Sequence, residues 1–206
     1  MEPIHTPPMS GSNAICVATV LLETGLIKMV EPITNFNLDT PAGLIRVRAT
    51  CRDGEALKIE IENVESFVDQ LNVPLKINEL DTLFVNTAFG GDSFVLVDAS
   101  DCGLKIEPKS GHLIRDLGKE IIKAANEQLG FKHPTKNWNH ISFCQFTDPI
   151  KRTDNLLTGL SAVVIEPGKI DRSPCGTGCS ARMALLVNQG KMKKDCLLYT
   201  SDAADE

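Results

Sequence analysis

Two short loops, far apart in the chain, share one residue pattern and one spacing. Ser10-Gly11-Ser12 and Cys175-Gly176-Thr177 each place a nucleophilic side chain before a glycine and a hydroxyl after it. In each case another glycine, Gly25 or Gly190, follows 15 residues after the nucleophile. Glycine commonly ends a helix because it adopts the left-handed conformation without steric cost. The repeat therefore predicts two loop–helix units and indicates two related half-domains that share a cleft.

Such loops suit the binding of a carboxylate. A turn of small residues exposes backbone N–H groups, and a helix N-terminus adds roughly half a positive charge. Two facing loops would hold a carboxylate between them, with Ser10 on one side of the substrate Cα and Cys175 on the other. Two acid/base groups on opposite faces can racemise a centre without turning the substrate over. Cysteine is a reasonable base because a helix N-terminus lowers a thiol pKa from its usual value of about 8.5.

The same residues allow other interpretations. A short glycine-rich loop before a helix is often only a turn and a cap, and Cys179 is expected to pack. A cysteine–histidine hydrolase stays open, since His133 or His140 could fold near Cys175. A zinc site on Cys175 and Cys179 lacks a second ligand pair. A phosphate-binding P-loop is excluded because no Gly-Lys-Ser/Thr follows the glycines.

The rest of the chain predicts an α+β fold rich in antiparallel strands. In Leu57–Val64, apolar residues alternate with lysine and glutamate, as in a strand with one solvent-exposed face. Gly111–Gly130 carries leucine and isoleucine at helical spacing. The helix that ends at Gly25 is apolar on nearly every face, so we expect it to be buried. Further strands are predicted over 33–40, 44–51, 82–87, 93–98, 141–146 and 159–165, and a last helix over 179–189.

Composition limits the classes of partner. With 206 residues, of which 42% are hydrophobic, the chain can bury one large or two small cores. Its net charge of −6 argues against a nucleic-acid or anionic-membrane surface. We expect no membrane span and no signal peptide, because no apolar run approaches ~20 residues. Seven cysteines without a Cys-x-x-Cys pair indicate free thiols in a reducing cytoplasm.

One segment closely resembles a catalytic motif of a known family. DRSPCGTGCSARMA, residues 171–184, resembles the second motif of the proline racemase family, which includes hydroxyproline 2-epimerases and trans-3-hydroxyproline dehydratases. LDTPAGL (38–44), GGDSF (90–94) and LETG (22–25) add to the resemblance. It implies a fold like that of diaminopimelate epimerase. Such a fold has two similar domains, each with an antiparallel-rich sheet around a central helix, and the active site lies between them.

The resemblance also implies roles for the residues of the second loop. Cys175 matches the second acid/base cysteine of the family. Gly176 and Thr177 match the loop whose amides bind the substrate carboxylate, and Asp171 matches the aspartate that faces the substrate amino group. Asp92, beside the two glycines of GGDSF, is expected to be a solvated turn residue, with a place in the cleft as the alternative.

The first loop departs from the family pattern. Ser10 lies where racemases carry their other cysteine, and Gly11 and Ser12 match the companion carboxylate-binding loop, with Ser12 replacing a more usual histidine. A serine hydroxyl is a far poorer base than a thiolate. Family members with serine and cysteine at these positions look like hydroxyproline 2-epimerases.

The resemblance therefore implies a cofactor-independent and metal-free racemase or epimerase acting at C2 of proline or hydroxyproline. Dehydration of trans-3-hydroxyproline and an inactive fragment stay open as alternatives. The expected partner is a small imino acid, with no nucleic acid and no membrane, and a homodimer is left open.

The resemblance also implies a chain truncated at both ends, because the family carries strands before the first motif and after the second helix. Residues 1–30 are expected to form a partial N-terminal half with the first loop and its helix. Residues 31–165 form a strand-rich body that spans both halves, and residues 166–192 carry the second loop and helix. Residues 193–206 look like a non-native tail.

Overall fold

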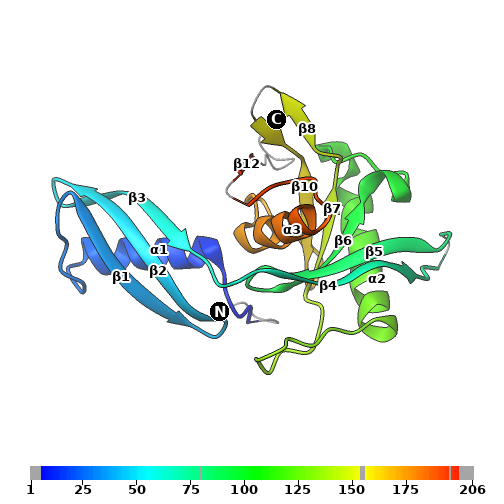
Figure 1. Cartoon of the computed structure of the whole chain (residues 1–206), viewed down its shortest axis with the longest axis horizontal. Helices are drawn as coiled ribbons and strands as arrows, with labels where there is room; N and C mark the ends of the chain where they lie inside the picture. Colours follow the sequence, from blue (N-terminus) through cyan, green and yellow to red (C-terminus); the bar gives the residue numbers. More distant parts are fainter. Residues whose placement is uncertain (1–5, 79, 154–155, 195, 200–206) are drawn as a thin grey trace.

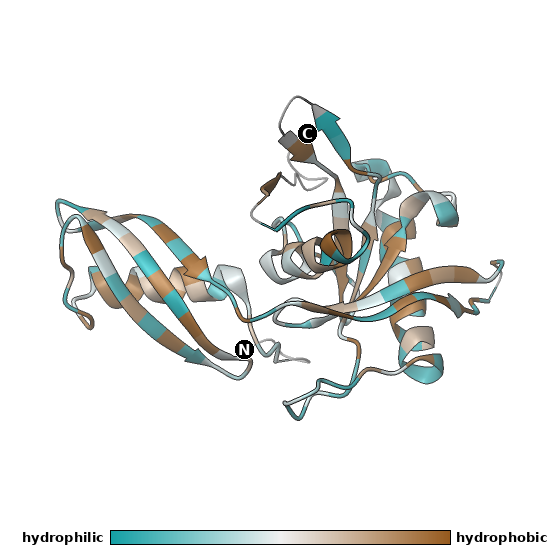
Figure 2. Cartoon of the chain, in the orientation of Figure 1, coloured by the Kyte–Doolittle hydropathy of each residue, from teal (hydrophilic) through white to brown (hydrophobic). Residues whose placement is uncertain are grey.

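The computed structural model describes residues 6–78, 80–153, 156–194 and 196–199, and within them the chain forms two lobes (Figure 1). The first lobe holds helix α1 (Gly11–Glu23) and an antiparallel sheet of β1 (Ile33–Thr40), β2 (Gly43–Arg52) and β3 (Glu55–Glu62), in that order. Buried and exposed residues alternate along β2, and Figure 2 shows the matching bands of hydropathy. Helix α1 covers the buried face, as expected for a sheet with one face on the core.

The second lobe is built on a six-stranded sheet with the strand order β11-β10-β7-β6-β5-β4. Its strands are β4 (Phe67–Leu75), β5 (Leu83–Phe89), β6 (Ser93–Asp98), β7 (Phe143–Thr147), β10 (Ser161–Ile165) and β11 (Lys169–Ile170). Neighbouring strands are antiparallel except β6 and β7, which run parallel. A parallel pair needs a long connection, and helix α2 (Gly111–Gln128) lies in it.

Two helices cover opposite faces of this sheet. Along β6, Val95 and Val97 join the hydrophobic core under α2. Phe94 and Leu96 join the core under α3 (Gly176–Asn188). Burial on both faces accounts for the uninterrupted apolar run in β6. The sheet therefore gives α3 a rigid support.

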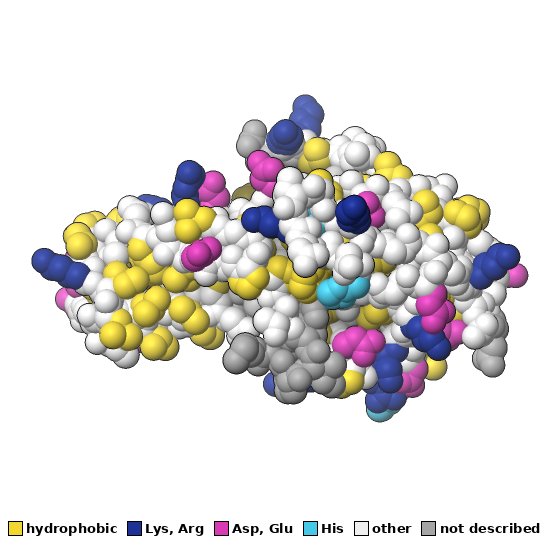
Figure 3. Space-filling model, turned by 90° about the horizontal axis from the view of Figure 1, so that it is seen from below, with side chains coloured by type: hydrophobic (Ala, Val, Ile, Leu, Met, Phe, Trp, Pro, Cys, Tyr) yellow, Lys and Arg dark blue, Asp and Glu magenta, His cyan; other side chains and the backbone are white. Residues whose placement is uncertain are grey.

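Helix α1 is less buried than its sequence predicts. One side of α1 packs on the first sheet through Ala14, Ala18 and Leu22. The other side carries three apolar side chains that are about half exposed, namely Ile15, Val17 and Val20. Figure 3 shows hydrophobic side chains gathered over this lobe. The prediction that this helix is buried all round is wrong, because in the described part of the chain the sheet covers one side of it.

A small third sheet lies against the C-terminal half of α3. Its strands are β8 (Lys151–Thr153), β9 (Leu156–Thr158) and β12 (Leu198–Tyr199). Leu157 of β9 packs with Leu186 of α3. Of the predicted non-native tail, residues 195 and 200–206 lie outside the described residues. None of the helices described here is long and apolar enough to cross a membrane.

Candidate active site

The N-termini of α1 and α3 meet where the two lobes join. A Cβ atom placed on Gly11 would lie 3.9 Å from Cα of Gly176, so the two loops are in contact. A cavity of about 100 Å³ lies at this contact. It is lined by all seven residues that the sequence nominates for the site: Ser10, Gly11, Ser12, Asp171, Cys175, Gly176 and Thr177. Folding thus brings both halves of the sequence repeat to one place.

The cavity also has an apolar wall that sequence reasoning missed. Pro7 and Met9 contribute to it from the segment before α1, and Phe143 and Ile165 contribute from the second sheet. Phe143 of β7 and Ile165 of β10 are paired across the two strands, so their side chains lie side by side. The contact between Phe143 and Ile165 depends on the register of β7 and β10, which a single sequence does not reveal. An apolar wall beside two helix N-termini suits a small ligand that is anionic at one end.

Cys175 is held in an unusual backbone conformation at the start of α3. Its φ of 55° and ψ of 84° fall in the left-handed region, which non-glycine residues rarely occupy. Side chains just before it shape this turn, since the backbone N–H of Ser173 donates to Asp171 Oδ1 at 2.9 Å and that of Cys175 donates to Ser173 Oγ at 3.1 Å. The Sγ atom is directed inward, and the residue is only 7% exposed. Such strain clusters at functional sites.

Burial controls the protonation of this thiol. Desolvation raises the pKa of Cys175 well above its usual range, and the negative charge of Asp171 raises it further. The backbone N–H of Gly178 and the hydroxyl of Thr177, whose Oγ1 is 3.8 Å from Sγ, lower this pKa but do not offset the burial. The sequence-based expectation of a lowered pKa is therefore wrong for this arrangement. Cys175 therefore holds its proton in this arrangement and is poised as an acid.

The opposite side of the cavity is open and carries hydroxyl groups. Ser10 lies at the N-cap position of α1 with an extended backbone, at φ −132°, and it is half-buried. Its side chain makes no capping hydrogen bond. Its Oγ lies 3.5 Å from the Oγ of the exposed Ser12. The site is therefore chemically asymmetric, with a buried thiol on one lobe and an accessible hydroxyl pair on the other.

The Gly90–Asp92 turn packs beneath the second loop. A Cβ on Gly90 would overlap the carbonyl of Thr177 and lie 2.5 Å from the backbone N of Ala181, so only glycine fits there. Asp92 is fully buried and accepts a hydrogen bond from the Ser142 hydroxyl at 2.6 Å. The expectation that Asp92 is solvated is wrong, because the turn is folded under α3 rather than exposed to solvent. Asp92 does not line the cavity either.

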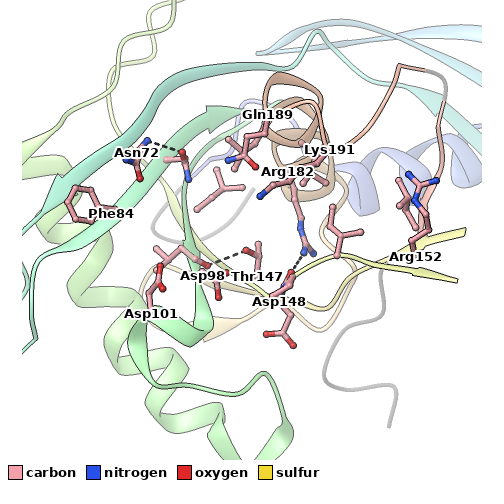
Figure 4. A pocket seen from close by; sticks show the side chains of 18 residues that line it. Asn72, Phe84, Asp98, Asp101, Thr147, Asp148, Arg152, Arg182, Gln189 and Lys191 are labelled. Atoms are coloured by element: carbon pink, nitrogen blue, oxygen red, sulfur yellow. Dashed lines mark hydrogen bonds between the residues drawn. The ribbon is translucent and has the colours of Figure 1, made fainter.

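A larger cavity of about 600 Å³ lies near the C-terminal half of α3 (Figure 4). The buried Arg182 is one of the residues that line it, and its guanidinium donates to the backbone carbonyls of Leu160 at 2.8 Å and Asp148 at 2.5 Å. These bonds tie α3 to the segments before β8 and after β9. None of the seven nominated residues lines this cavity. We assign Arg182 a structural role.

The two histidines that could have assisted Cys175 lie outside its cavity. Neither His133 nor His140 lines the cavity of Cys175. His133 accepts the backbone N–H groups of Thr135 and Lys136 through Nδ1, at 3.2 and 3.1 Å. The geometry therefore does not support a cysteine–histidine hydrolase. Among the described residues, no three His, Cys, Asp or Glu side chains gather as a metal site.

Solved structures that resemble this chain include two from Agrobacterium species. A hydroxyproline epimerase from Agrobacterium vitis, with bound trans-4-hydroxy-L-proline, superposes with a TM-score of 0.90 at 33% identity. That match covers 98% of this chain and 57% of the other. A probable proline racemase from Agrobacterium radiobacter K84, with bound carbonate, gives a TM-score of 0.91 at 33% identity, with coverage of 98% and 58%. The chain thus spans a little over half the length of these relatives.

A more distant structure shares the fold alone. A methylitaconate-delta-isomerase superposes with a TM-score of 0.52 at 14% identity, over 94% of this chain and 64% of the other. The model of the family described as proline racemase matches residues 1–201 of this chain. The α+β fold, the relatives and this match agree, and the chain belongs to the proline racemase family.

Proposed function

We propose that this chain carries the active site of a cofactor-independent epimerase or racemase that acts at C2 of hydroxyproline or proline. The observation that carries the proposal is the single cavity where Ser10 and Cys175 approach from different lobes. A two-lobed arrangement of the diaminopimelate epimerase type, with one helix of each lobe directed at the site, fits this role. The bound trans-4-hydroxy-L-proline of the Agrobacterium vitis relative supports an imino-acid substrate.

The substrate carboxylate is bound between the two helix N-termini. The first N–H groups of a helix have no partner within it, and those of α1 and α3 belong to loop residues that line the cavity. Gly11 and Ser12 on one side and Gly176 and Thr177 on the other supply these donors. Hydrogen bonds from them also stabilise the negative charge that moves onto the carboxylate when C2 loses its proton.

The substrate itself activates Cys175. Asp171 lines the same cavity, and its charge is one cause of the raised pKa of the Cys175 thiol. A ring ammonium beside Asp171 compensates that charge and also brings a positive charge into the cavity that the thiol borders, which opposes the larger effect of burial, so a bound imino acid favours the thiolate. The thiolate then takes the C2 proton from one face. In the reverse direction the thiol returns a proton to that face.

The opposite face is served by the Ser10–Ser12 hydroxyl pair. Because Ser12 is exposed, this pair can pass a proton from water to C2, which leaves a hydroxide ion. That hydroxide is neutralised by the proton that the Cys175 thiol released to water when the thiolate formed, so no net acid or base is consumed. Ser10 is a weak base, so removal of the proton from this face is the harder chemical step. This asymmetry lets kcat differ between the two directions, while the ratio of their kcat/KM values is fixed by the equilibrium constant.

The same asymmetry supports dehydration of trans-3-hydroxyproline as a second candidate. Elimination needs one base at C2 and protonation of the hydroxide that leaves C3. Cys175 supplies the base, and the Ser10–Ser12 pair lies where it can help the leaving group.

Product analysis separates the two activities. The protein is incubated with trans-4-hydroxy-L-proline and, separately, with trans-3-hydroxy-L-proline. Epimerisation gives the C2 epimer, which chiral chromatography resolves. Dehydration gives a cyclic imine, which borohydride traps. If neither product forms from either substrate, the proposal is contradicted and an inactive fragment is favoured.

A further inference from the structure

The segment that carries the chain from the first lobe to the second runs over residues 63–66, between β3 and β4 (Figure 1). Asn63 begins it and is half-buried. Its Nδ2 donates to the carbonyl of Gly90 at 2.7 Å and to Oγ of Ser180 at 3.2 Å. Its Oδ1 accepts the N–H of Val64 at 2.9 Å. Both ends of this amide are thus engaged, and two of the bonds reach the second lobe.

Ser180 connects Asn63 to the second loop through two hydrogen bonds. Ser180 lies in the second turn of α3, and its Oγ donates to the carbonyl of Gly176 at 3.0 Å. Serine often makes such a bond within a helix, but its hydroxyl is usually free to rotate. Here the amide of Asn63 can only donate to Oγ, so the single proton of Ser180 is directed to Gly176.

The Gly176 carbonyl and the Thr177 N–H belong to one peptide unit. In a planar trans peptide these two groups point in opposite directions. A carbonyl fixed toward Ser180 therefore fixes the Thr177 N–H on the side away from Ser180. Both residues line the cavity, and this N–H lies in the first turn of α3, where no intrahelical partner is available.

The bond from Asn63 to Gly90 acts on the next peptide unit, which joins Thr177 to Gly178. The Gly90 turn lies against the carbonyl of Thr177 so closely that a Cβ on Gly90 would overlap it. Asn63 thus holds both neighbours of the second loop, Ser180 above it in α3 and Gly90 beneath it.

We infer that Asn63 is a positioning residue that orients the Gly176–Thr177 peptide toward the substrate carboxylate, through Ser180 and Gly90. The inference rests on the proposed function, because it assigns the Thr177 N–H to carboxylate binding. It makes the lobe-crossing segment part of the binding site without any contact between Asn63 and the substrate. Loss of the amide leaves the helical bond to the Gly176 carbonyl in place but removes the support from Ser180 and Gly90, so the peptide shifts and binding suffers more than the chemical step.

The kinetic test uses Asn63→Ala, Ser180→Ala and their double variant, with Asn126→Ala as the matched control. The amide of Asn126 also donates to two carbonyls, of Ile122 at 3.0 Å and Ile141 at 2.8 Å, and Asn126 does not line the cavity. We expect Asn63→Ala to raise KM for trans-4-hydroxy-L-proline about tenfold with kcat changed less than threefold. Ser180→Ala should raise KM less, and adding it to Asn63→Ala should change little, since both act on one chain of bonds. An unchanged KM in Asn63→Ala, or effects that simply add, would overturn the inference.

Asn63→Asp keeps the shape of the side chain and guards against a folding defect. Its carboxylate faces the Gly90 carbonyl and draws the Ser180 proton away from Gly176, so KM should rise at least as much as in Asn63→Ala. Restoration of the native KM by this variant would show that shape, and not donation, matters.

Amide hydrogen exchange tests the inference without turnover. Residues 173–180 should exchange at least fivefold faster in Asn63→Ala than in the native protein, and Asn126→Ala should leave this segment unchanged relative to the rest of the chain. If the native protein makes no product but this difference holds, the proposed activity fails and the positioning role stands. If product forms and the exchange rates match, the positioning role fails alone.

Discussion

Gly178, in the first turn of α3, is the position where a single methyl group should disturb the candidate site most selectively. A Cβ on Gly178 would lie 3.1 Å from Sγ of Cys175 and 3.3 Å from Cε1 of Phe94. Ordinary contacts are ~3.5–4.0 Å, so Gly178→Ala must displace Sγ by about 0.4–0.9 Å or the Phe94 ring by about 0.2–0.7 Å. Phe94 is fully buried in the sheet, whereas Sγ borders the cavity, so the thiol moves.

Gly178→Ala should reduce kcat markedly while lowering the free energy of unfolding only modestly. A misplacement of about 1 Å can cost roughly a hundredfold in rate, so a shift of half that size predicts a loss of about tenfold in kcat. Overpacking costs about 1–3 kcal/mol of unfolding free energy, and replacing a helical glycine by alanine returns about 1 kcal/mol. The net loss of stability should therefore stay below ~2 kcal/mol.

Gly118→Ala is the matched control for this variant. Gly118 lies in α2 on the opposite face of the same sheet, and its Cβ would lie 2.5 Å from Cγ2 of Val164. This variant should lose at least as much stability and keep its kcat. Steady-state kinetics and urea denaturation of both variants decide the matter. Native kcat in Gly178→Ala, or equal losses of kcat in both variants, would refute the assigned position of the thiol.

Two further predictions concern stability. Burial raises the pKa of the Cys175 thiol above its ordinary value of 9.0, so the unfolded chain loses this proton first as the pH rises. The stabilisation is complete below pH 9, and above it the free energy of unfolding should fall by up to about 1.4 kcal/mol per pH unit. Denaturation from pH 8 to 10.5 should show a shallower fall in Cys175→Ser, and identical slopes would contradict the assignment. Both polar atoms of the buried Gln145 side chain lack a hydrogen-bond partner among the described residues. Gln145→Met should raise the free energy of unfolding by about 1–3 kcal/mol, and a lower urea midpoint would count against this reasoning.

Regular elements could be predicted closely where one periodicity dominates. Strands β1 and β6 begin and end at the predicted residues, and α2 ends within two residues of its prediction. Strand β4 escaped prediction because its pairing with β5 shifts register twice, and it contains Pro74 and the positive φ of Asn72. Such irregularities break the alternation on which strand prediction depends. Strands β8, β9, β11 and β12 have only two or three residues each, too few to show a pattern.

In the candidate site, too, some features could be predicted from the sequence and others could not. Its loop residues are visible in the sequence because nucleophile, glycine and hydroxyl are adjacent there. The sequence predicts a lowered pKa for Cys175, which is wrong because the rule for helix N-termini does not include the burial of the thiol against the sheet. Asn63 has no local signature, since its partner Ser180 is 117 residues away.

Exchange of the C2 hydrogen in D₂O tests the central claim, that Cys175 and Ser10 serve opposite faces of one substrate. Proton NMR follows loss of the C2–H signal from each C2 epimer of 4-hydroxyproline. The native protein should exchange and invert both epimers. Cys175→Ser should abolish exchange and inversion, whereas Cys179→Ser, one turn further along α3 and outside the cavity, should retain both. Ser10→Ala should lose inversion yet still exchange the one epimer whose C2–H faces the thiol. Exchange by Cys175→Ser at the native rate, or inversion by Ser10→Ala at the native rate, would contradict the assignment of these two residues.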